Sequence, residues 1–171
     1  FGIHQRKGFI ELTGEVGAGK TTLCRKLLED LGPRYKTALI LNPCLSSHQL
    51  IKTIALEFGL KPRSIDRVAY LEALNEFVLK EVNAGHDIVV IIDEAQNLSD
   101  ELLEQVRLLS NLETDRQKLM QIVLMGQPEL REKLEQPELR QLRQRITVRY
   151  HLRPLDLRET GYYVSHRLTL A

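Results

Sequence analysis

The sequence predicts an α/β fold in which helices cover both faces of a parallel, five-stranded sheet. Five short β-type runs alternate with segments whose apolar residues recur at helical spacing, an order typical of parallel sheets with helical connections. The third and fourth runs are almost wholly apolar, as expected of strands that are covered on both faces. The chain has 171 residues, of which 43% are hydrophobic, and this suits one domain with a substantial core.

Five predicted strands form the sheet, and helical patterns lie between them. The strands are Gly8–Leu12, Thr37–Asn42, Asp87–Asp93, Gln121–Gly126 and Ile146–Leu152. The order along the chain contains no internal repeat and no low-complexity tract.

The helices are predicted from apolar residues that share a face and from the residues that start or stop a helix. Ser46 and Gln49 resemble a capping box at the start of the second helix, and Ser99 is expected to cap the fourth. Pro128 fits the first turn of a fifth helix, and a last helical pattern covers Asp156–Leu168. The apolar faces of the first four helices are Leu23, Leu27, Leu28 and Leu31; Leu50, Ile51, Ile54 and Phe58; Leu71, Leu74, Val78 and Val82; and Leu102, Val106 and Leu109.

The stretch GEVGAGKTTL follows the first predicted strand and opens the first predicted helix. It fits the phosphate-loop pattern G-x-x-x-x-G-K-[ST]. Glycines let the backbone wrap around phosphate oxygens, and the start of a helix adds its positive dipole end. Lys20 is expected to reach the β- and γ-phosphates of a nucleotide, and the Thr21 hydroxyl is expected to bind Mg²⁺. The residues assigned to phosphate binding are Gly14, Glu15, Val16, Gly17, Ala18, Gly19, Lys20, Thr21 and Thr22, of which Glu15 and Thr22 have no individual role.

An acidic pair ends the third predicted strand. Asp93 and Glu94 follow four apolar residues, so both carboxylates are expected at the carboxyl edge of the sheet, where ligands bind in α/β folds. Asp93 is expected to hold Mg²⁺. Glu94 can polarise a water molecule for attack on the γ-phosphate, which favours hydrolysis over transfer to a small substrate. A small-molecule kinase and a nucleotide switch without turnover are the alternatives, and the switch requires an idle Glu94.

A polar sensor of the γ-phosphate is expected beside these carboxylates. Gln127 follows the fourth predicted strand directly, and it would face the γ-phosphate if that strand lay between the first and third strands. Asn97 and Asn111 are weaker candidates for this role. Because no guanine-reading N-K-x-D pattern is present, adenine is the expected base.

Arginines gather near the carboxyl end of the chain. Three interpretations of the arginines before the fifth strand remain open: a solvated helix face, a nucleic-acid patch and an arginine finger. A finger would reach the γ-phosphate of a neighbouring subunit, which requires an oligomer. Arg145 and Arg143 are the preferred fingers, in that order. The cluster consists of Arg140, Arg143, Arg145, Arg149, Arg153 and Arg158.

Composition limits the partners and the location of the chain. The net charge is +1, so overall charge favours no partner. Cys24 and Cys44 lack metal-ligand spacing and are interpreted as reduced thiols of a cytoplasmic protein. No apolar stretch approaches the roughly 20 residues of a membrane span, and no signal peptide is evident. The chain begins at Phe1 and stops within a helical pattern, so we expect it to be part of a longer protein.

Four blocks resemble one family closely: KGFIELTGEVGAGKTTLCRKLL, VVIIDEAQNLS, LLSNLETDRQKLMQIVLMGQPELREKL and LRQRITVRYHLRPLDLRET. Together they make nearly the whole chain similar to the ExeA-like, or general secretion pathway protein A, group of AAA+ ATPases, which includes the ATPases of MSHA pilus biogenesis. The resemblance implies a P-loop NTPase with strand order 5-1-4-3-2. It implies an ATPase core over residues 1–153 and the start of a helical lid over residues 154–171. It also implies ATP, Mg²⁺ and ring-like, nucleotide-dependent homo-oligomers.

The resemblance assigns roles to matching positions. Lys20 and Thr21 take the Walker A places, and Asp93 and Glu94 take the Walker B places. Gln127 stands at the first sensor, and Arg143 and Arg145 match the region of the arginine finger. A second sensor arginine is expected beyond residue 171, and the segment that usually touches adenine is expected before residue 1. A fragment with these bounds is expected to bind nucleotide weakly.

The function implied is ATP hydrolysis that drives assembly of a bacterial secretion machine or a type IV or MSHA pilus. The expected partners are envelope assembly proteins. The expected location is the cytoplasm, at the inner membrane through regions outside this chain. Related AAA+ ATPases of transposition carry similar blocks, so a DNA-dependent regulatory ATPase is the alternative.

Overall fold

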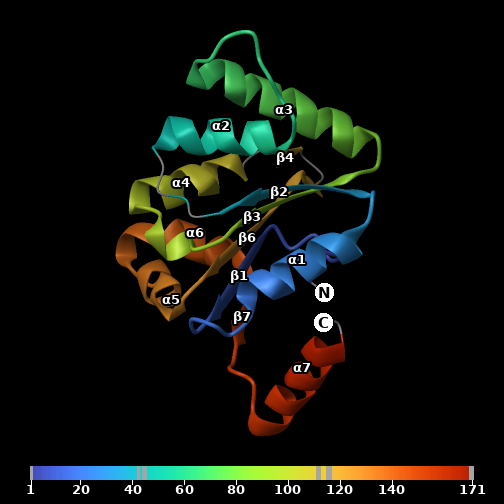
Figure 1. The fold of residues 1–171 in the computed structure, drawn as a ribbon. Coiled ribbons are helices and arrows are strands. Elements are labelled where there is room, and N and C mark those ends of the chain that lie inside the picture. The colour runs from blue at the N-terminus through green and yellow to red at the C-terminus, as the bar shows by residue number, and fades with distance from the viewer. Residues whose placement is uncertain (1, 42, 44–45, 111–112, 115–116, 170–171) are drawn as a thin grey trace.

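A five-stranded parallel sheet forms the centre of the structure, a computed structural model that describes residues 2–41, 43, 46–110, 113–114 and 117–169 (Figure 1). The strand order is β2-β3-β6-β1-β7, which is the expected order 5-1-4-3-2 read from the other edge. The expected α/β class and parallel sheet are therefore confirmed. The strands are β1 (Phe9–Gly14), β2 (Tyr35–Ile40), β3 (Asp87–Ile92), β6 (Met120–Gly126) and β7 (Ile146–Leu152).

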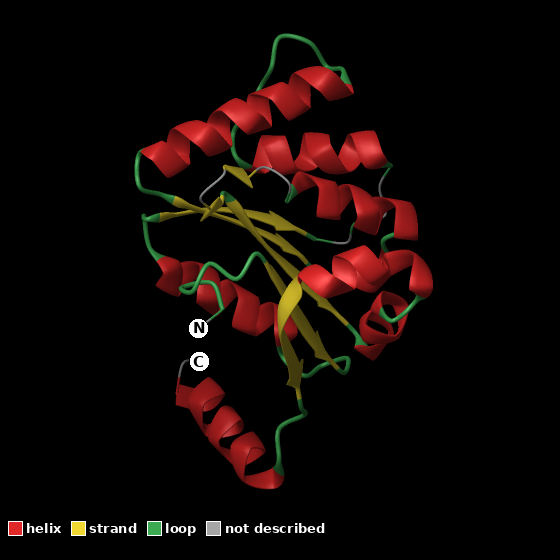
Figure 2. Ribbon diagram, turned by 180° about the vertical axis from the view of Figure 1, so that it is seen from behind, coloured by secondary structure: helices red, strands yellow, loops and turns green. Residues whose placement is uncertain are grey.

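Helices lie on both faces of the sheet (Figure 2). Helix α1 covers one face, and the other face is covered by the group α2 to α6, with α3 packed on α2. The α-helices are α1 (Lys20–Leu31), α2 (Ser47–Glu57), α3 (Arg67–Asn83), α4 (Asp100–Leu109), α5 (Pro128–Leu134), α6 (Arg140–Arg145) and α7 (Leu157–Thr169). The 3₁₀ turns are η1 (Ala95–Asn97) and η2 (Pro137–Leu139).

Strand β3 shows how the sequence produces the three layers. All six of its residues are buried, and successive side chains point to opposite faces. Ile88, Val90 and Ile92 pack under the larger helical layer. Val89 and Ile91 pack against α1 on the other face. An apolar run without alternation is therefore the pattern of a strand that is covered twice.

Helix α1 buries most of the predicted face: Leu31 is buried, and Leu27 and Leu28 are partly buried against the same cluster. Leu23 is 43% exposed, whereas Cys24 is 1% exposed and packs against the sheet. The helix begins at Lys20, whose side chain is buried, and a turn of 3.6 residues places position 24 on the same side. The prediction for Leu23 was wrong because it followed the spacing of the leucines, whereas the buried Lys20 sets which side of the helix faces the sheet.

The predicted caps are confirmed. The backbone N–H of Gln49 donates to Ser46 Oγ at 3.3 Å, and the Ser46 N–H donates to Gln49 Oε1 at 2.8 Å, which completes the capping box. Ser99 Oγ accepts from the N–H of Leu102 at 3.3 Å at the start of α4.

Strand bounds differ slightly from the prediction. Strand β2 begins at Tyr35, where the chain pairs with the start of β3 at Asp87. A short antiparallel pair, β4 (Glu113–Thr114) and β5 (Gln117–Lys118), was not predicted because two-residue strands leave no periodic pattern. Four residues named in the sequence analysis lie outside the described residues, namely Phe1, Asn42, Cys44 and Asn111.

Helix α7 stands apart from the three layers in both views (Figures 1 and 2). Its bounds agree with the predicted helix within one residue at each end. None of its described residues is buried, and Leu157 and Leu168 are 92% and 73% exposed. The boundary between an ATPase core and a lid near residue 153 stays a prediction.

Candidate active site

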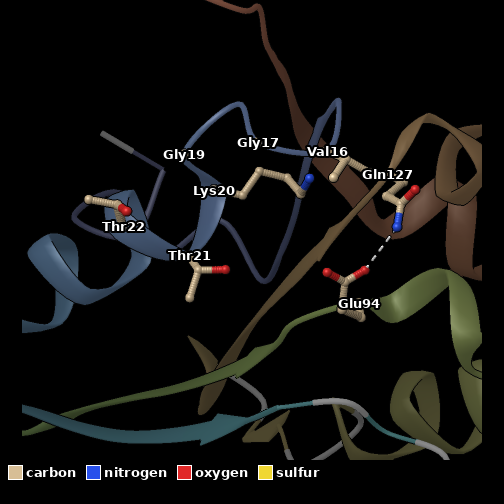
Figure 3. A pocket seen from close by; sticks show the side chains of 8 residues that line it. All are labelled: Val16, Gly17, Gly19, Lys20, Thr21, Thr22, Glu94 and Gln127. Carbon is tan, nitrogen blue, oxygen red and sulfur yellow. Dashed lines mark hydrogen bonds between the residues drawn. The ribbon is translucent and has the colours of Figure 1, made fainter. Parts of the chain in front are cut away.

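Most of the predicted phosphate-binding residues meet Glu94 and Gln127 where the carboxyl ends of β1, β3 and β6 lie side by side (Figure 3). A pocket of about 320 Å³ opens there between the glycine-rich loop and the ends of β3 and β6. The central place of β6, between β1 and β3, is what brings Gln127 to the pocket, as the sequence analysis required. The lining residues are Val16, Gly17, Gly19, Lys20, Thr21, Thr22, Glu94 and Gln127.

The loop needs its glycines for two different reasons. Gly17 and Gly19 have φ angles of 80° and 89°, a left-handed conformation that favours glycine, and no atom lies within 4 Å of where a Cβ would stand. Gly14 has no positive φ, but a Cβ there would lie 2.7 Å from the carbonyl oxygen of Leu152 on β7. Backbone conformation therefore requires the later glycines, and close approach of a neighbouring strand requires the first.

Three of the nine predicted phosphate-binding residues, Gly14, Glu15 and Ala18, do not line the pocket. Two of them contribute through their backbones instead. Lys20 Nζ donates to the carbonyl oxygens of Gly14 at 2.7 Å and Glu15 at 3.0 Å. An ammonium group has three N–H donors, so one donor is left for the pocket side.

Thr21 and Asp93 lie within hydrogen-bond distance of one another. Thr21 Oγ1 donates to Asp93 Oδ2 at 3.0 Å, and the backbone N–H of Glu94 donates to Asp93 Oδ1 at 2.9 Å. Asp93 is only 3% exposed, and these two hydrogen bonds hold its carboxylate beside Thr21, which lines the pocket. Hydroxyl and carboxylate oxygens are ligands that Mg²⁺ accepts together with nucleotide phosphates, and the open glycine loop leaves room for those phosphates. The residues present therefore fit a magnesium nucleotide.

Glu94 and Gln127 point toward one another across the pocket (Figure 3). Gln127 Nε2 donates to Glu94 Oε2 at 3.4 Å. Glu94 also has a φ of 52°, a left-handed conformation that costs a non-glycine residue roughly 1–2 kcal/mol. The chain turns sharply at Glu94 to enter η1, and this turn directs the carboxylate into the pocket.

Sequence reasoning missed Gln96, which lies between these two residues. Its Nε2 donates to Glu94 Oε2 at 2.6 Å, and its Oε1 accepts from the backbone N–H of Gln127 at 3.2 Å. The one signal for it is Gly126, where a Cβ would lie 2.5 Å from Gln96 Oε1. We call Glu94, Gln96 and Gln127 the glutamine–glutamate corner.

The candidate arginine fingers have partners within their own chain. Arg143 Nη1 donates to Glu135 at 2.5 Å, and Arg145 Nη1 donates to the Ser110 hydroxyl at 2.8 Å. Hydrogen bonds from Arg149 and Arg143 lower the pKa of Glu135. Neither candidate lines the pocket of its own chain, so a role toward a neighbouring subunit stays a prediction.

The weaker sensor candidate Asn97 is exposed and does not line the pocket. Two buried groups nearby have shifted pKa values. Burial, with the negative charge of Asp93 adding to it, raises the pKa of the Cys24 thiol to about 11. This thiol is therefore neutral at physiological pH and serves as part of the core. Burial also raises the pKa of Glu11 on β1, against the attraction of Arg149.

The sequence of residues 3–134 matches the AAA domain family. The chain belongs to the AAA domain family. This AAA domain is thus a P-loop nucleotide-binding domain with a five-stranded parallel sheet.

One curated relative extends well beyond this AAA domain. General secretion pathway protein A of Aeromonas hydrophila is 49% identical over 175 aligned positions, which cover 100% of this chain. The chain spans only 31% of the length of that relative.

Solved structures share the fold of this AAA domain at low sequence identity. ORC2 of Aeropyrum pernix in its ADP form superposes with a TM-score of 0.74 at 20% identity, over 99% of this chain and 49% of that one. Cdc6p of Pyrobaculum aerophilum gives 0.72 at 20% identity, over 95% and 43%. The Drosophila ORC bound to DNA gives 0.70 at 19% identity, over 95% and 42%. Within the described residues, no helix combines the length and the apolar character that crossing a membrane demands.

Proposed function

We propose that this AAA domain binds ATP with Mg²⁺ and hydrolyses it to drive assembly of a bacterial secretion machine or a type IV or MSHA pilus. One observation carries the enzymatic part: the phosphate loop with Thr21, and Glu94 with Gln127, line one pocket, and Asp93 accepts a hydrogen bond from Thr21. The 49% identity to general secretion pathway protein A supports the role in secretion.

Binding rests mainly on the loop and the start of α1. The backbone N–H groups of the loop and the positive end of the α1 dipole would bind the phosphates, and Lys20 would add a charge-assisted hydrogen bond. Thr21 and Asp93 would hold Mg²⁺, which neutralises phosphate charge when it is bound. This arrangement favours a nucleoside triphosphate over a smaller anion.

Hydrolysis rests on Glu94. A water molecule placed between Glu94 and the γ-phosphate attacks the phosphorus in line with the leaving oxygen. The bond from the water oxygen to phosphorus forms as the bond to the β–γ bridging oxygen breaks. Glu94 accepts a proton from the water, and Gln127 contributes an amide donor beside it. In this proposal Glu94 and Gln127 act on the water, while the phosphate loop holds the phosphates.

An arginine from a neighbouring subunit would complete the site. Arg145 and Arg143 are the proposed fingers, and a finger in trans implies a ring-like homo-oligomer that forms with nucleotide. The proposed location is the cytoplasm, at the inner membrane through regions outside this chain. The proposed partners are proteins that assemble the secretion or pilus machine.

A DNA-dependent regulatory ATPase of the transposition type is the second candidate. Exposed arginines near the carboxyl end favour it, among them Arg140 and Arg153. The fold is also shared with an ORC structure that is described as bound to DNA. These observations are weaker than the sequence identity over the whole chain, so we place the candidate second.

The deciding experiment measures ATP hydrolysis by the full-length protein, by Glu94→Gln and by the control Glu101→Gln, whose exposed carboxylate lies outside the pocket. Each is titrated with protein concentration and with double-stranded DNA. We expect activity that rises more than linearly with concentration, is lost in Glu94→Gln and ignores DNA. Severalfold stimulation by DNA at low salt would support the second candidate. Full activity of Glu94→Gln would show that the wrong carboxylate has been assigned.

A further inference from the structure

The proposed hydrolysis gives roles to Glu94 and Gln127 but none to Gln96, the side chain between them. Gln96 uses its amide donor on the carboxylate of Glu94, at 2.6 Å, and its acceptor on the backbone N–H of Gln127, at 3.2 Å. A single side chain therefore joins the end of β3 to the end of β6, two strands that are neighbours in the sheet.

The surroundings of Gln96 fix its place. Gly126 leaves space for the amide, because a Cβ there would lie 2.5 Å from Gln96 Oε1 and 3.1 Å from Leu130 Cβ. Lys133 of α5 donates to the backbone carbonyl of Gln96 at 3.2 Å and also to that of Leu98, so α5 holds the η1 turn in position. Helix α5 thus holds the backbone of Gln96, and Gly126 at the end of β6 leaves the space for its side chain.

The hydrogen bonds of Glu94 are divided unequally between its two oxygens. Both amide donors, Gln96 Nε2 at 2.6 Å and Gln127 Nε2 at 3.4 Å, bind Oε2. Within the described part of the chain, Oε1 accepts no hydrogen bond. Figure 3 shows this other oxygen on the side of Lys20 and Thr21. Holding Oε2 therefore leaves Oε1 as the oxygen that can take a proton from a water molecule beside the phosphate loop.

We propose that Gln96 is a positioning residue that holds Glu94 Oε2 beside Gln127 and so presents Oε1 to the attacking water. This inference rests on the proposed function, because it acts through the general base Glu94. A carboxylate without this bond rotates about its terminal torsion, which is broad for glutamate. Loss of a fixed orientation lowers the rate of the chemical step more than it lowers nucleotide affinity.

Two substitutions in the full-length protein separate the two hydrogen bonds of Gln96. Gln96→Ala removes both. Gln96→Glu keeps an oxygen that can accept from the Gln127 N–H but replaces the donor to Glu94 with a second carboxylate. Steady-state ATP hydrolysis gives kcat and KM, and hydrogen–deuterium exchange at the Gln127 amide reports the backbone bond independently of turnover.

We expect Gln96→Ala to lower kcat about 10- to 100-fold with KM within about threefold, and to speed exchange at Gln127. We expect Gln96→Glu to lower kcat at least as far while exchange stays slow. The control Gln136→Ala changes an exposed glutamine whose side chain makes no hydrogen bond within the described part of the chain, and it should change neither readout.

Two results would overturn the inference while leaving the proposed function intact. One is kcat of Gln96→Ala within twofold of the parent while Glu94→Gln is inactive. The other is an active Gln96→Glu with slow exchange, because Gln96 would then support only the backbone of Gln127. Absence of ATP hydrolysis in the parent protein, or full activity of Glu94→Gln, would overturn the proposed function and this inference with it.

Discussion

The phosphate loop and the glutamine–glutamate corner border the same pocket but are built in opposite ways. The loop is one continuous stretch, and its lysine is held by carbonyl oxygens of the same stretch, Gly14 and Glu15. The corner consists of three side chains from two strand ends, and its bonds to Gln127 join residues 31 and 33 positions apart. Backbone shape therefore determines the first region, whereas side-chain contacts between separate segments determine the second.

The phosphate loop and the glutamine–glutamate corner tolerate different substitutions. Val16 lies in the loop with 78% of its surface exposed, so its side chain contributes little to the shape of the loop. In the corner, the space beside Gly126 is filled by a neighbouring side chain. Variants of the loop should alter nucleotide binding, and variants of the corner should alter turnover.

The largest expected effect is that of Lys20→Met, which removes the charged group of the loop and keeps its volume. Because the ammonium would contact phosphate charge in both the bound and the reacting nucleotide, we expect hydrolysis to fall by about 10³-fold and affinity to weaken as well. Fluorescent-nucleotide binding and phosphate release measure the two effects. Lys26→Met is the control, since this exposed lysine of α1 forms its ion pairs among the described residues with Glu29 and Asp30 and lies outside the pocket. Equal losses in both variants would contradict the assignment.

The second-largest expected effect is that of Gln127→Ala, which changes the glutamine–glutamate corner. The amide donor beside Glu94 would be lost while the loop stays unchanged, so we expect kcat to fall about 10- to 100-fold and KM to stay within about threefold. Steady-state kinetics against ATP concentration separates the two parameters. A rise in KM without a fall in kcat would mean that Gln127 belongs with the loop and that the comparison is misplaced.

A smaller effect, on the free energy of unfolding, distinguishes Gly19 in the loop from Gly126 beside the corner. Gly19→Ala forces a left-handed alanine and should lower the free energy of unfolding by roughly 1–2 kcal/mol, whatever stands nearby. Gly126→Ala should also be destabilising, because its Cβ would meet Gln96 and Leu130. Denaturant unfolding of each variant with and without Gln96→Ala gives a double-mutant cycle. We expect Gln96→Ala to reduce the destabilisation caused by Gly126→Ala but not that caused by Gly19→Ala. An equal reduction for the two glycine variants would contradict this expectation.

The smallest effect concerns the strands below the two regions. Strand β1, under the loop, carries the buried Glu11, whereas β6, which leads into the corner, carries the buried neutral amide of Gln121. Burial raises the pKa of Glu11 above its ordinary value of 4.5, so the folded state binds more protons than the unfolded state. The contribution of Glu11 to the free energy of unfolding is therefore complete below pH 4.5, and it is lost as the pH rises through the raised pKa of the folded state. The unfolding free energy of Glu11→Gln, measured across these pH values, should not show the decline that Glu11 causes in the parent protein. The same pH dependence in both proteins would contradict the prediction.

The sequence was sufficient where structure is local. The phosphate loop, the helix caps at Ser46 and Ser99 and the acidic end of β3 depend on neighbouring residues, and their patterns predicted them. Gln96 was missed because its partners include Gln127, on a strand end that the sequence does not place beside it. The pairs of Arg143 with Glu135 and of Arg145 with Ser110 were missed for the same reason. Strand order itself came from family resemblance, because periodicity shows strands but not their neighbours.

The position of β1 in the sheet also constrains how the protein is made. Of the five strands in this sheet, β1 is synthesised first, yet its two partners are β6 and β7, the last two of the five to leave the ribosome. Strands β2 and β3 can pair early, but β1 has no neighbour until residues 120–126 are available. Contacts this distant in sequence form slowly because the intervening chain must first be ordered. A nascent chain that ends before β6 therefore contains every residue of the phosphate loop without its strand partners, and the ability to hold a nucleotide arises only late in synthesis.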